Sequence, residues 1–127
     1  MTLLPLELAV LGKLLDGDHP MLTALRRQLP ELGVTERKLT GVGFFTTFSM
    51  TDERLLVEVP PGASPFGDVE ATISGMQHGA GFLLWLKDGR IDMLEGYSYD
   101  EPWPDHVGEF VLAYSHAERT AVLAKLG

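Results

Sequence analysis

The fold of this chain is decided by the stretch Gly79-Ala-Gly-Phe-Leu-Leu-Trp-Leu-Lys-Asp-Gly-Arg-Ile-Asp-Met-Leu-Glu-Gly-Tyr-Ser-Tyr99. Within it, Asp88-Gly89 is a two-residue loop of the kind that type I′ turns favour, because Asp and Gly tolerate a positive φ at low cost. The runs on both sides of this loop are rich in Leu, Trp, Ile and Met, which are typical of strands that face a core. The stretch therefore predicts an antiparallel hairpin over residues 80–99.

The turn also predicts a register, and that register makes Glu95 unusual. Counted outward from the turn, Glu95 falls on a sheet face that otherwise carries Phe, Leu, Ile and Met side chains. A carboxylate on such a face must raise its pKa, find a charged partner or accept several hydrogen bonds. The predicted pairs are Leu86 with Ile91, Leu84 with Met93, Phe82 with Glu95, and Gly81 with Gly96.

Length and composition indicate one domain, residues 1–127, with 45% apolar residues and no cysteine. The longest apolar run, Phe82 to Leu86, is far shorter than the roughly 20 residues that a membrane span needs. The Leu-rich N-terminal stretch has no basic segment ahead of it and carries Glu7, Lys13 and Asp16, so it does not read as a signal peptide. We expect a cytoplasmic protein without membrane contact, disulfides or thiolate chemistry.

Hydrophobic periodicity predicts an α+β fold in two layers, with segregated helices and strands. Two N-terminal helices fill a helical layer over residues 1–33, because leucines recur at helical spacing and Asp18-His-Pro20 is a typical helix start. A mainly antiparallel sheet of five to six strands follows over residues 37–115. A short C-terminal helix occupies residues 116–126, where Ser115 and Glu118 resemble a capping box. The expected strands are residues 38–50, 54–59, 68–76, 82–86 (covered on both faces), 90–99 and 110–114; the first turn of the C-terminal helix is the alternative for residues 110–114.

Charge is unevenly distributed along the chain, whose formal net charge is −8. From Ile91 to Glu118 there are seven acids and no Lys or Arg, so this surface disfavours nucleic acid and attracts basic partners. Solubility is the alternative explanation of such an acidic surface. The seven acids are Asp92, Glu95, Asp100, Glu101, Asp105, Glu109 and Glu118.

Two kinds of binding site follow from these patterns, together with one structural alternative. The leading hypothesis is a non-enzymatic protein that presents its acidic region to a basic protein partner, as toxin-immunity proteins do; its candidate residues include Asp92, Asp100, Glu101 and Asp105. The rival hypothesis is a small-molecule-binding or weakly catalytic pocket at the base of the 80–99 hairpin. Its candidate residues are Glu95, Tyr97, Tyr99, His78 and Trp103. A homodimer that pairs two exposed strand edges is the third alternative.

No motif predicts a catalytic residue, a metal site or a cofactor. The four histidines have no spacing of four residues that would bring two imidazoles together on a helix, and no Gly-x-Ser-x-Gly sequence occurs. The glycine-rich segment Gly75-Met-Gln-His-Gly-Ala-Gly81 joins two predicted strands, so it does not fit a phosphate-binding loop. We therefore expect a binding function more than an enzymatic one.

Several runs resemble a family of small, uncharacterised bacterial proteins. They are Leu39-Thr-Gly-Val-Gly-Phe-Phe-Thr46, Gly79-Ala-Gly-Phe-Leu-Leu-Trp-Leu86, Asp88-Gly-Arg-Ile-Asp-Met-Leu-Glu-Gly-Tyr97 and Pro102-Trp-Pro104. Members of this family share a TGVGFFT strand and a DGxIxxLEGYxY…WP hairpin. The resemblance covers about Arg37 to Pro104, and it implies a common compact fold and a bacterial cytoplasmic origin. It brings no established reaction, so it assigns no residue a role.

Overall fold

The computed structural model describes the backbone of residues 1–127 and the side chains of residues 1–115 and 119–127. It contains three α-helices, two short 3₁₀ helices (η1 and η2) and six strands. In chain order the elements are α1 (Pro5–Leu14), α2 (Pro20–Arg26), η1 (Leu29–Glu31), β1 (Gly33–Leu39), β2 (Gly43–Ser49), η2 (Glu53–Leu55), β3 (Val69–Ile73), β4 (Ala80–Lys87), β5 (Arg90–Ser98), β6 (Phe110–Tyr114) and α3 (His116–Lys125).

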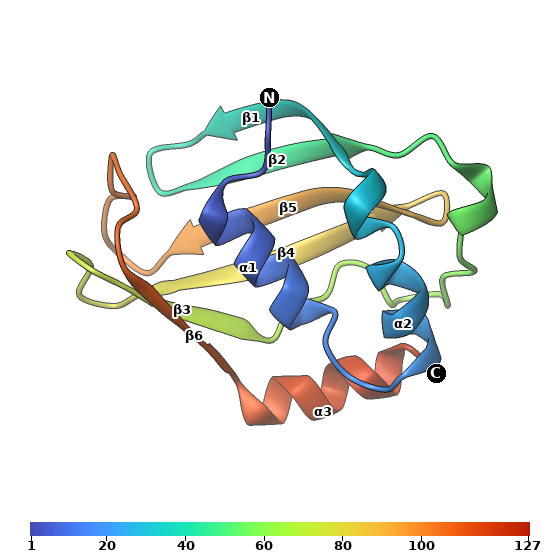
Figure 1. Cartoon of the computed structure of the whole chain (residues 1–127). Helices are drawn as coiled ribbons and strands as arrows, with labels where there is room; N and C mark the ends of the chain where they lie inside the picture. The colour runs from blue at the N-terminus through green and yellow to red at the C-terminus, as the bar shows by residue number, and fades with distance from the viewer.

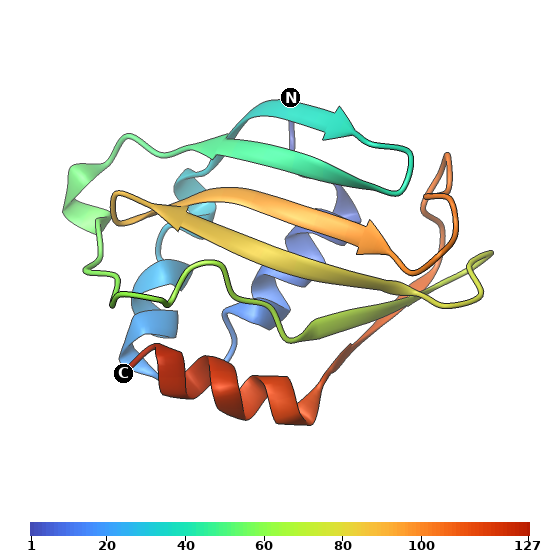
Figure 2. The same cartoon turned by 180° about the vertical axis from the view of Figure 1, so that it is seen from behind.

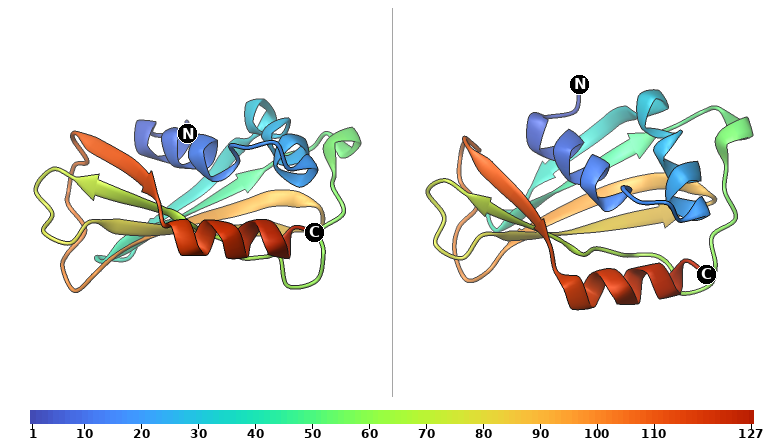
Figure 3. Two further views of the ribbon diagram at one scale, coloured as in Figure 1. Left: turned by 90° about the horizontal axis from the view of Figure 1, so that it is seen from below. Right: turned by 60° about the horizontal axis from the view of Figure 1, so that its bottom comes forward.

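The six strands form one antiparallel sheet in the order β1-β2-β5-β4-β3-β6. Helices α1 and α2 cross one face of this sheet, and α3 lies beside the β3 side of it (Figures 1 and 3). Seen from behind, the opposite face of β1, β2, β5 and β4 carries no helix (Figure 2). The predicted α+β class with two N-terminal helices, an antiparallel sheet and a short C-terminal helix is confirmed.

The strands differ from the prediction on the N-terminal side of the sheet. The predicted strand over residues 38–50 is two strands, because the chain reverses at Thr40–Val42, where Gly41 has a φ of +87°. The sheet thus begins at Gly33, before the predicted start at residue 37. Residues 54–59 form no regular strand, since η2 occupies their start. Strand β1 was not predicted because most of its side chains are charged or polar. It therefore lacks the alternation of apolar and polar residues that is typical of a half-buried strand.

The predicted hairpin register is correct next to the turn and wrong beyond it. Asp92 is an extra residue in β5, a β-bulge that shifts every following pair by one. Because side chains alternate along a strand, a shift of one residue sends Glu95 to the opposite face of the sheet. The observed pairs are Leu86 with Ile91, Trp85 with Met93, Leu84 with Leu94, Leu83 with Glu95, Phe82 with Gly96, and Gly81 with Tyr97.

The hydrophobic core lies between the helices and one face of the sheet. In β4 the side chains of Phe82, Leu84 and Leu86 are buried, whereas Leu83 and Trp85, which point the other way, are only half-buried. The prediction that this strand is covered on both faces is therefore wrong. Its two apolar faces meet different surroundings because the chain places α1 and α2 on the same side.

Helix α3 is fastened to the rest of the molecule by Arg119. The Arg119 guanidinium donates to the Leu14 carbonyl at 3.1 Å and to Asp68 Oδ2 at 3.0 Å, and it also donates to the Asp16 carbonyl. The same guanidinium lies 4.6 Å from the centre of the Tyr114 ring. These contacts join α3 to the end of α1 and to the segment before β3. The Glu118 half of the predicted capping box lies outside the described side chains.

Candidate functional site

A cavity of about 560 Å³ opens at one end of the sheet. It lies between the N-terminal half of α1, the β1–β2 turn and the segment from Trp103 to Phe110. Its volume falls within the range of roughly 300–1,000 Å³ that is usual for ligand pockets. The side chains that line it are mostly apolar and include Leu6, Leu39, Phe44, Trp103, Val107 and Phe110.

Hydrogen bonds fix the walls of this cavity. The Trp103 amide donates to the Gly41 carbonyl at 2.8 Å, and the Ser98 amide donates to the Val42 carbonyl at 2.8 Å. The Ser74 amide donates to the Glu109 carbonyl at 2.9 Å, which holds the far end of the segment. The segment between β5 and β6 is thus tied to the rest of the sheet at both of its ends. A pocket with fixed walls loses less entropy on binding than one that a mobile loop must complete.

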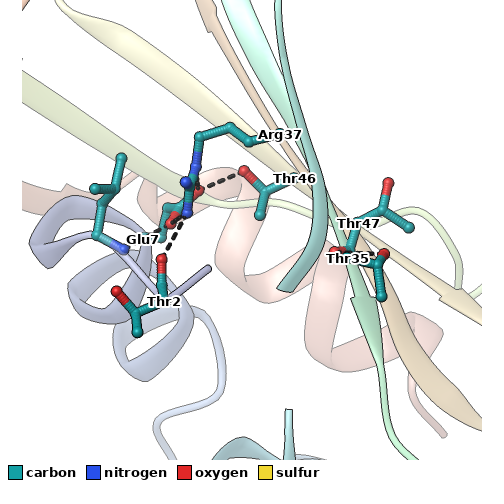
Figure 4. Close-up of polar contacts among 7 residues, drawn as sticks. Thr2, Glu7, Thr35, Arg37, Thr46 and Thr47 are labelled. Atoms are coloured by element: carbon teal, nitrogen blue, oxygen red, sulfur yellow. Dashed lines mark hydrogen bonds and ion pairs between the residues drawn. The ribbon is translucent and has the colours of Figure 1, made fainter. Parts of the chain in front are cut away.

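The buried Glu7 and the partly buried Arg37 form an ion pair beside the cavity (Figure 4). Arg37 Nη2 donates to Glu7 Oε1 at 2.6 Å, and Arg37 Nε donates to Glu7 Oε2 at 2.9 Å, so the contact is bidentate. The Glu7 carboxylate also accepts hydrogen bonds from the Leu4 amide, at 2.7 Å, and from the Thr46 hydroxyl. Arg37 Nη2 also donates to the Thr2 carbonyl at 2.9 Å.

These contacts set the protonation state of Glu7. Burial by itself favours the neutral acid, yet the hydrogen bonds from Arg37, Leu4 and Thr46 and the positive charge of Arg37 together hold the pKa of Glu7 below its usual value of 4.5. Glu7 is therefore ionised at neutral pH, and its charge is balanced by Arg37. The ion pair contributes no net charge to the wall of the cavity.

Glu95 lies outside the cavity, on the sheet face that no helix covers. Its Oε1 accepts a hydrogen bond from Trp85 Nε1 at 3.1 Å, and the side chain is half-buried. The β-bulge at Asp92 is the reason, because it turns Glu95 away from the core face on which the unbulged register had placed it. The carboxylate thus accepts a hydrogen bond from the indole N–H, and the apolar side chains of the core do not enclose it.

The other residues of the predicted pocket fall into separate places. Tyr97 and Tyr99 pack edge to face, with ring centres 5.6 Å apart, over the space that Gly81 leaves free. His78 and Tyr99 line a smaller hollow of about 310 Å³ on the polar side of β3. Trp103 lines the large cavity, where its ring packs edge to face on Phe44 with ring centres 5.4 Å apart. The structure therefore does not join Glu95, the tyrosines, His78 and Trp103 in one pocket.

The predicted acidic region is also divided. Asp92 lies near the start of β5 and Asp100 just beyond its end, so an extended strand of about 3.3 Å per residue separates them along the sheet. Asp100, Glu101, Asp105 and Glu109 follow one another in the segment between β5 and β6. The acidic surface next to the cavity is therefore this segment, residues 99–109, called here the acidic segment.

Glu101 has a structural role within the acidic segment. Its two carboxylate oxygens accept hydrogen bonds from the backbone amides of Gln77, at 3.0 Å, and His78, at 2.7 Å. These hydrogen bonds lower the pKa of Glu101 below its usual value of 4.5. They tie the acidic segment to the β3–β4 turn. Asp105, in contrast, is exposed and lines the mouth of the cavity beside His106.

Sequence reasoning missed Glu7, Arg37 and Thr46. The available signal was Glu7 itself, an acid in the middle of a leucine-rich helical stripe. An acid at such a position predicts a buried partner, by the same reasoning that was applied to Glu95. Its partner could not be found from spacing, because Arg37 is 30 residues and Thr46 is 39 residues away along the chain.

Comparisons with protein families, with curated proteins and with solved structures find no match. Among the residues that the structure describes, no helix is long and apolar enough to cross a membrane, and no group of three or more His, Asp or Glu side chains is placed to hold a metal ion. The candidate site is thus defined by the geometry of this chain alone.

Proposed function

We propose that this chain is a cytoplasmic binding protein that recognises a basic protein partner at the end of the sheet where the cavity and the acidic segment meet. The observation that carries the proposal is their adjacency: Asp105 belongs to the acidic segment and also lines the mouth of the apolar cavity. Protein interfaces commonly combine an apolar centre with a charged rim, and an acidic rim selects basic partners and speeds their association. Toxin neutralisation is the most concrete version of this role.

The sequence around the acidic segment contributes no lysine or arginine to offset its charge. Between Ile91 and Glu118 the sequence has no Lys or Arg, and Arg37, the cation that lines the cavity, is already paired with Glu7. Exposed acids leave a negative potential that extends into solvent over about a Debye length, roughly 8 Å at physiological salt. Association with a basic partner should therefore be fast and sensitive to salt.

A second candidate function, binding of a small molecule, is supported by the size of the cavity and its apolar lining. A hollow of about 560 Å³ with a few polar groups on its wall also fits a compact organic ligand. This version places the ligand between α1 and Trp103, not at the base of the 80–99 hairpin as the sequence suggested.

The test compares affinity captures from the native host by three forms of the protein. The first is the unmodified chain, and the second carries Asp100→Asn, Asp105→Asn and Glu109→Gln, which remove exposed charges of the acidic segment. The matched control loses three exposed acids elsewhere through the substitutions Glu36→Gln, Glu53→Gln and Glu58→Gln.

At low salt, we expect the unmodified chain and the control to recover the same basic protein in equal amounts. The acidic-segment variant should recover at least tenfold less of it, and high salt should abolish its recovery by all three forms. Equal recovery by all three forms would contradict the proposal. Recovery that depends on the control acids instead would move the interface to another face.

A further inference from the structure

The mouth of the cavity carries apolar surface that the fold leaves in water. Leu39 is 71% exposed and Leu4 is 47% exposed, although both line a cavity whose deeper wall includes the buried Leu6 and Phe44. Two large aliphatic side chains, one from the N-cap of α1 and one from the end of β1, thus flank an apolar hollow. Covering this surface with an apolar group is favourable by roughly 25 cal/mol for each Å² removed from water. An occupant of the cavity therefore gains most from a bulky apolar group.

Arg37 adds a directional polar feature to the same wall. Its Nε and Nη2 are used by Glu7 and by the Thr2 carbonyl, whereas Nη1 makes no hydrogen bond within the described part of the chain. Two N–H donors of the guanidinium are therefore left for another acceptor. Since Glu7 balances the charge of Arg37 and Asp105 adds a negative charge at the mouth, these donors suit an uncharged oxygen, such as an amide carbonyl, better than a carboxylate.

The acidic segment supplies the third element of recognition. Asp105 lies at the mouth, and Asp100 and Glu109 are exposed on the same segment. Cationic groups on both sides of an apolar group would meet these carboxylates when the apolar group enters the cavity. A free apolar molecule makes no use of them, whereas a basic peptide chain uses the apolar hollow, the free donors and the acids together.

We propose that the cavity is the anchor pocket for a peptide segment of the basic partner. A large apolar side chain of that segment enters the hollow between Leu39 and Trp103, a main-chain carbonyl next to it accepts from Arg37 Nη1, and flanking Lys or Arg side chains contact the acidic segment. This inference rests on the proposed function. It adds to it the chemistry of the recognised sequence, a bulky apolar residue flanked by basic residues.

The experiment titrates the ¹⁵N-labelled full chain with capped probes and follows backbone amides and the Trp103 indole by NMR. The probes are acetyl-Lys-Lys-Trp-Lys-Lys-amide, its analogue with Ala in place of Trp, its analogue with Glu in place of every Lys, and N-acetyltryptophanamide. We expect saturable shifts around Leu39, Trp103 and Val107 with the first probe, and at least tenfold weaker binding of the other three.

Two variants assign the binding to the cavity. Leu39→Ser removes an exposed apolar side chain at the mouth, so it should fold normally and weaken the first probe at least fivefold. Val111→Ser is the matched control, because Val111 is 70% exposed on β6 and does not line the cavity. Equal weakening by both variants would overturn the assignment to the cavity.

The probes separate failure of this inference from failure of the proposed function. Equal binding of the Trp and Ala peptides, with shifts confined to residues 99–109, keeps recognition of a basic partner and overturns the anchor pocket. Equal binding of N-acetyltryptophanamide and the Trp peptide overturns both and favours a free small ligand. An absence of saturable shifts with every probe overturns the anchor pocket outright.

Discussion

Removing the charge of Glu7 should destabilise the protein far more than removing an exposed acid. In Glu7→Gln, one carboxylate oxygen becomes an NH₂ group, yet all partners of the carboxylate are donors: the Leu4 amide, Nε and Nη2 of Arg37, and the Thr46 hydroxyl. At either position the NH₂ group therefore faces an N–H donor of Arg37 and cannot accept a hydrogen bond from it.

The magnitude follows from the burial of the pair. Removing one partner of a buried ion pair typically costs about 3–5 kcal/mol, because the other charge is left without compensation. The Arg37 side chain is 17% exposed, against 2% for Glu7, so water can partly solvate the orphaned guanidinium. We therefore expect Glu7→Gln to lower the free energy of unfolding by about 3 kcal/mol, the low end of that range.

Urea denaturation at pH 7, followed by tryptophan fluorescence, measures this loss, and the same series at lower pH tests its electrostatic origin. Because the pKa of Glu7 is depressed in the folded protein, its contribution to stability is fully present above its unfolded value of about 4.5 and is lost as the pH falls through the folded pKa. The difference between the unmodified chain and Glu7→Gln should thus be constant at neutral pH and shrink below pH 4.5.

Asp52→Asn is the matched control for this experiment. Asp52 also forms a bidentate contact with an arginine, Arg54, but the Arg54 side chain is 89% exposed, so the change in stability should be much smaller. A loss below 1 kcal/mol for Glu7→Gln, which is the usual range of exposed pairs, would refute the reasoning, as would a difference that does not change between pH 7 and pH 3.

Four further substitutions test the packing. Gly96→Ala places a Cβ against the Phe44 ring, so it should lower the free energy of unfolding by about 1–3 kcal/mol in urea denaturation. Gly12→Ala, on the open side of α1, should raise it by about 0.5–1 kcal/mol. Equal effects of the two substitutions would contradict the contacts described. Glu95→Gln keeps an oxygen that accepts the hydrogen bond from the Trp85 indole on the uncovered face. The free energy of unfolding should therefore change by less than about 0.5 kcal/mol. A larger loss would contradict the placement of Glu95 outside the core. Arg119→Met should raise hydrogen exchange across α3 selectively, and unchanged protection would show that apolar packing alone holds that helix.

The hairpin shows how far local sequence reaches and where it stops. Asp88-Gly89 correctly predicts the turn, which has a positive φ at both residues, and it correctly pairs Leu86 with Ile91. The bulge at Asp92 has no local signature, because an extra strand residue leaves the composition of the strand unchanged. Since side chains alternate with a period of two, this one residue decides that Glu95 lies on the uncovered face.

Sequence alone determined the class of the fold, since helical and strand periodicities are local properties that each segment carries by itself. It also determined the acidic character of residues 91–118. Tertiary structure alone decided which residues meet: Glu7 and Arg37 come together across 30 residues, and the cavity forms where α1, the β1–β2 turn and the acidic segment converge. The physical reason is that burial of the common core brings segments together that are distant along the chain. The local sequence of one segment does not specify which other segment will pack against it.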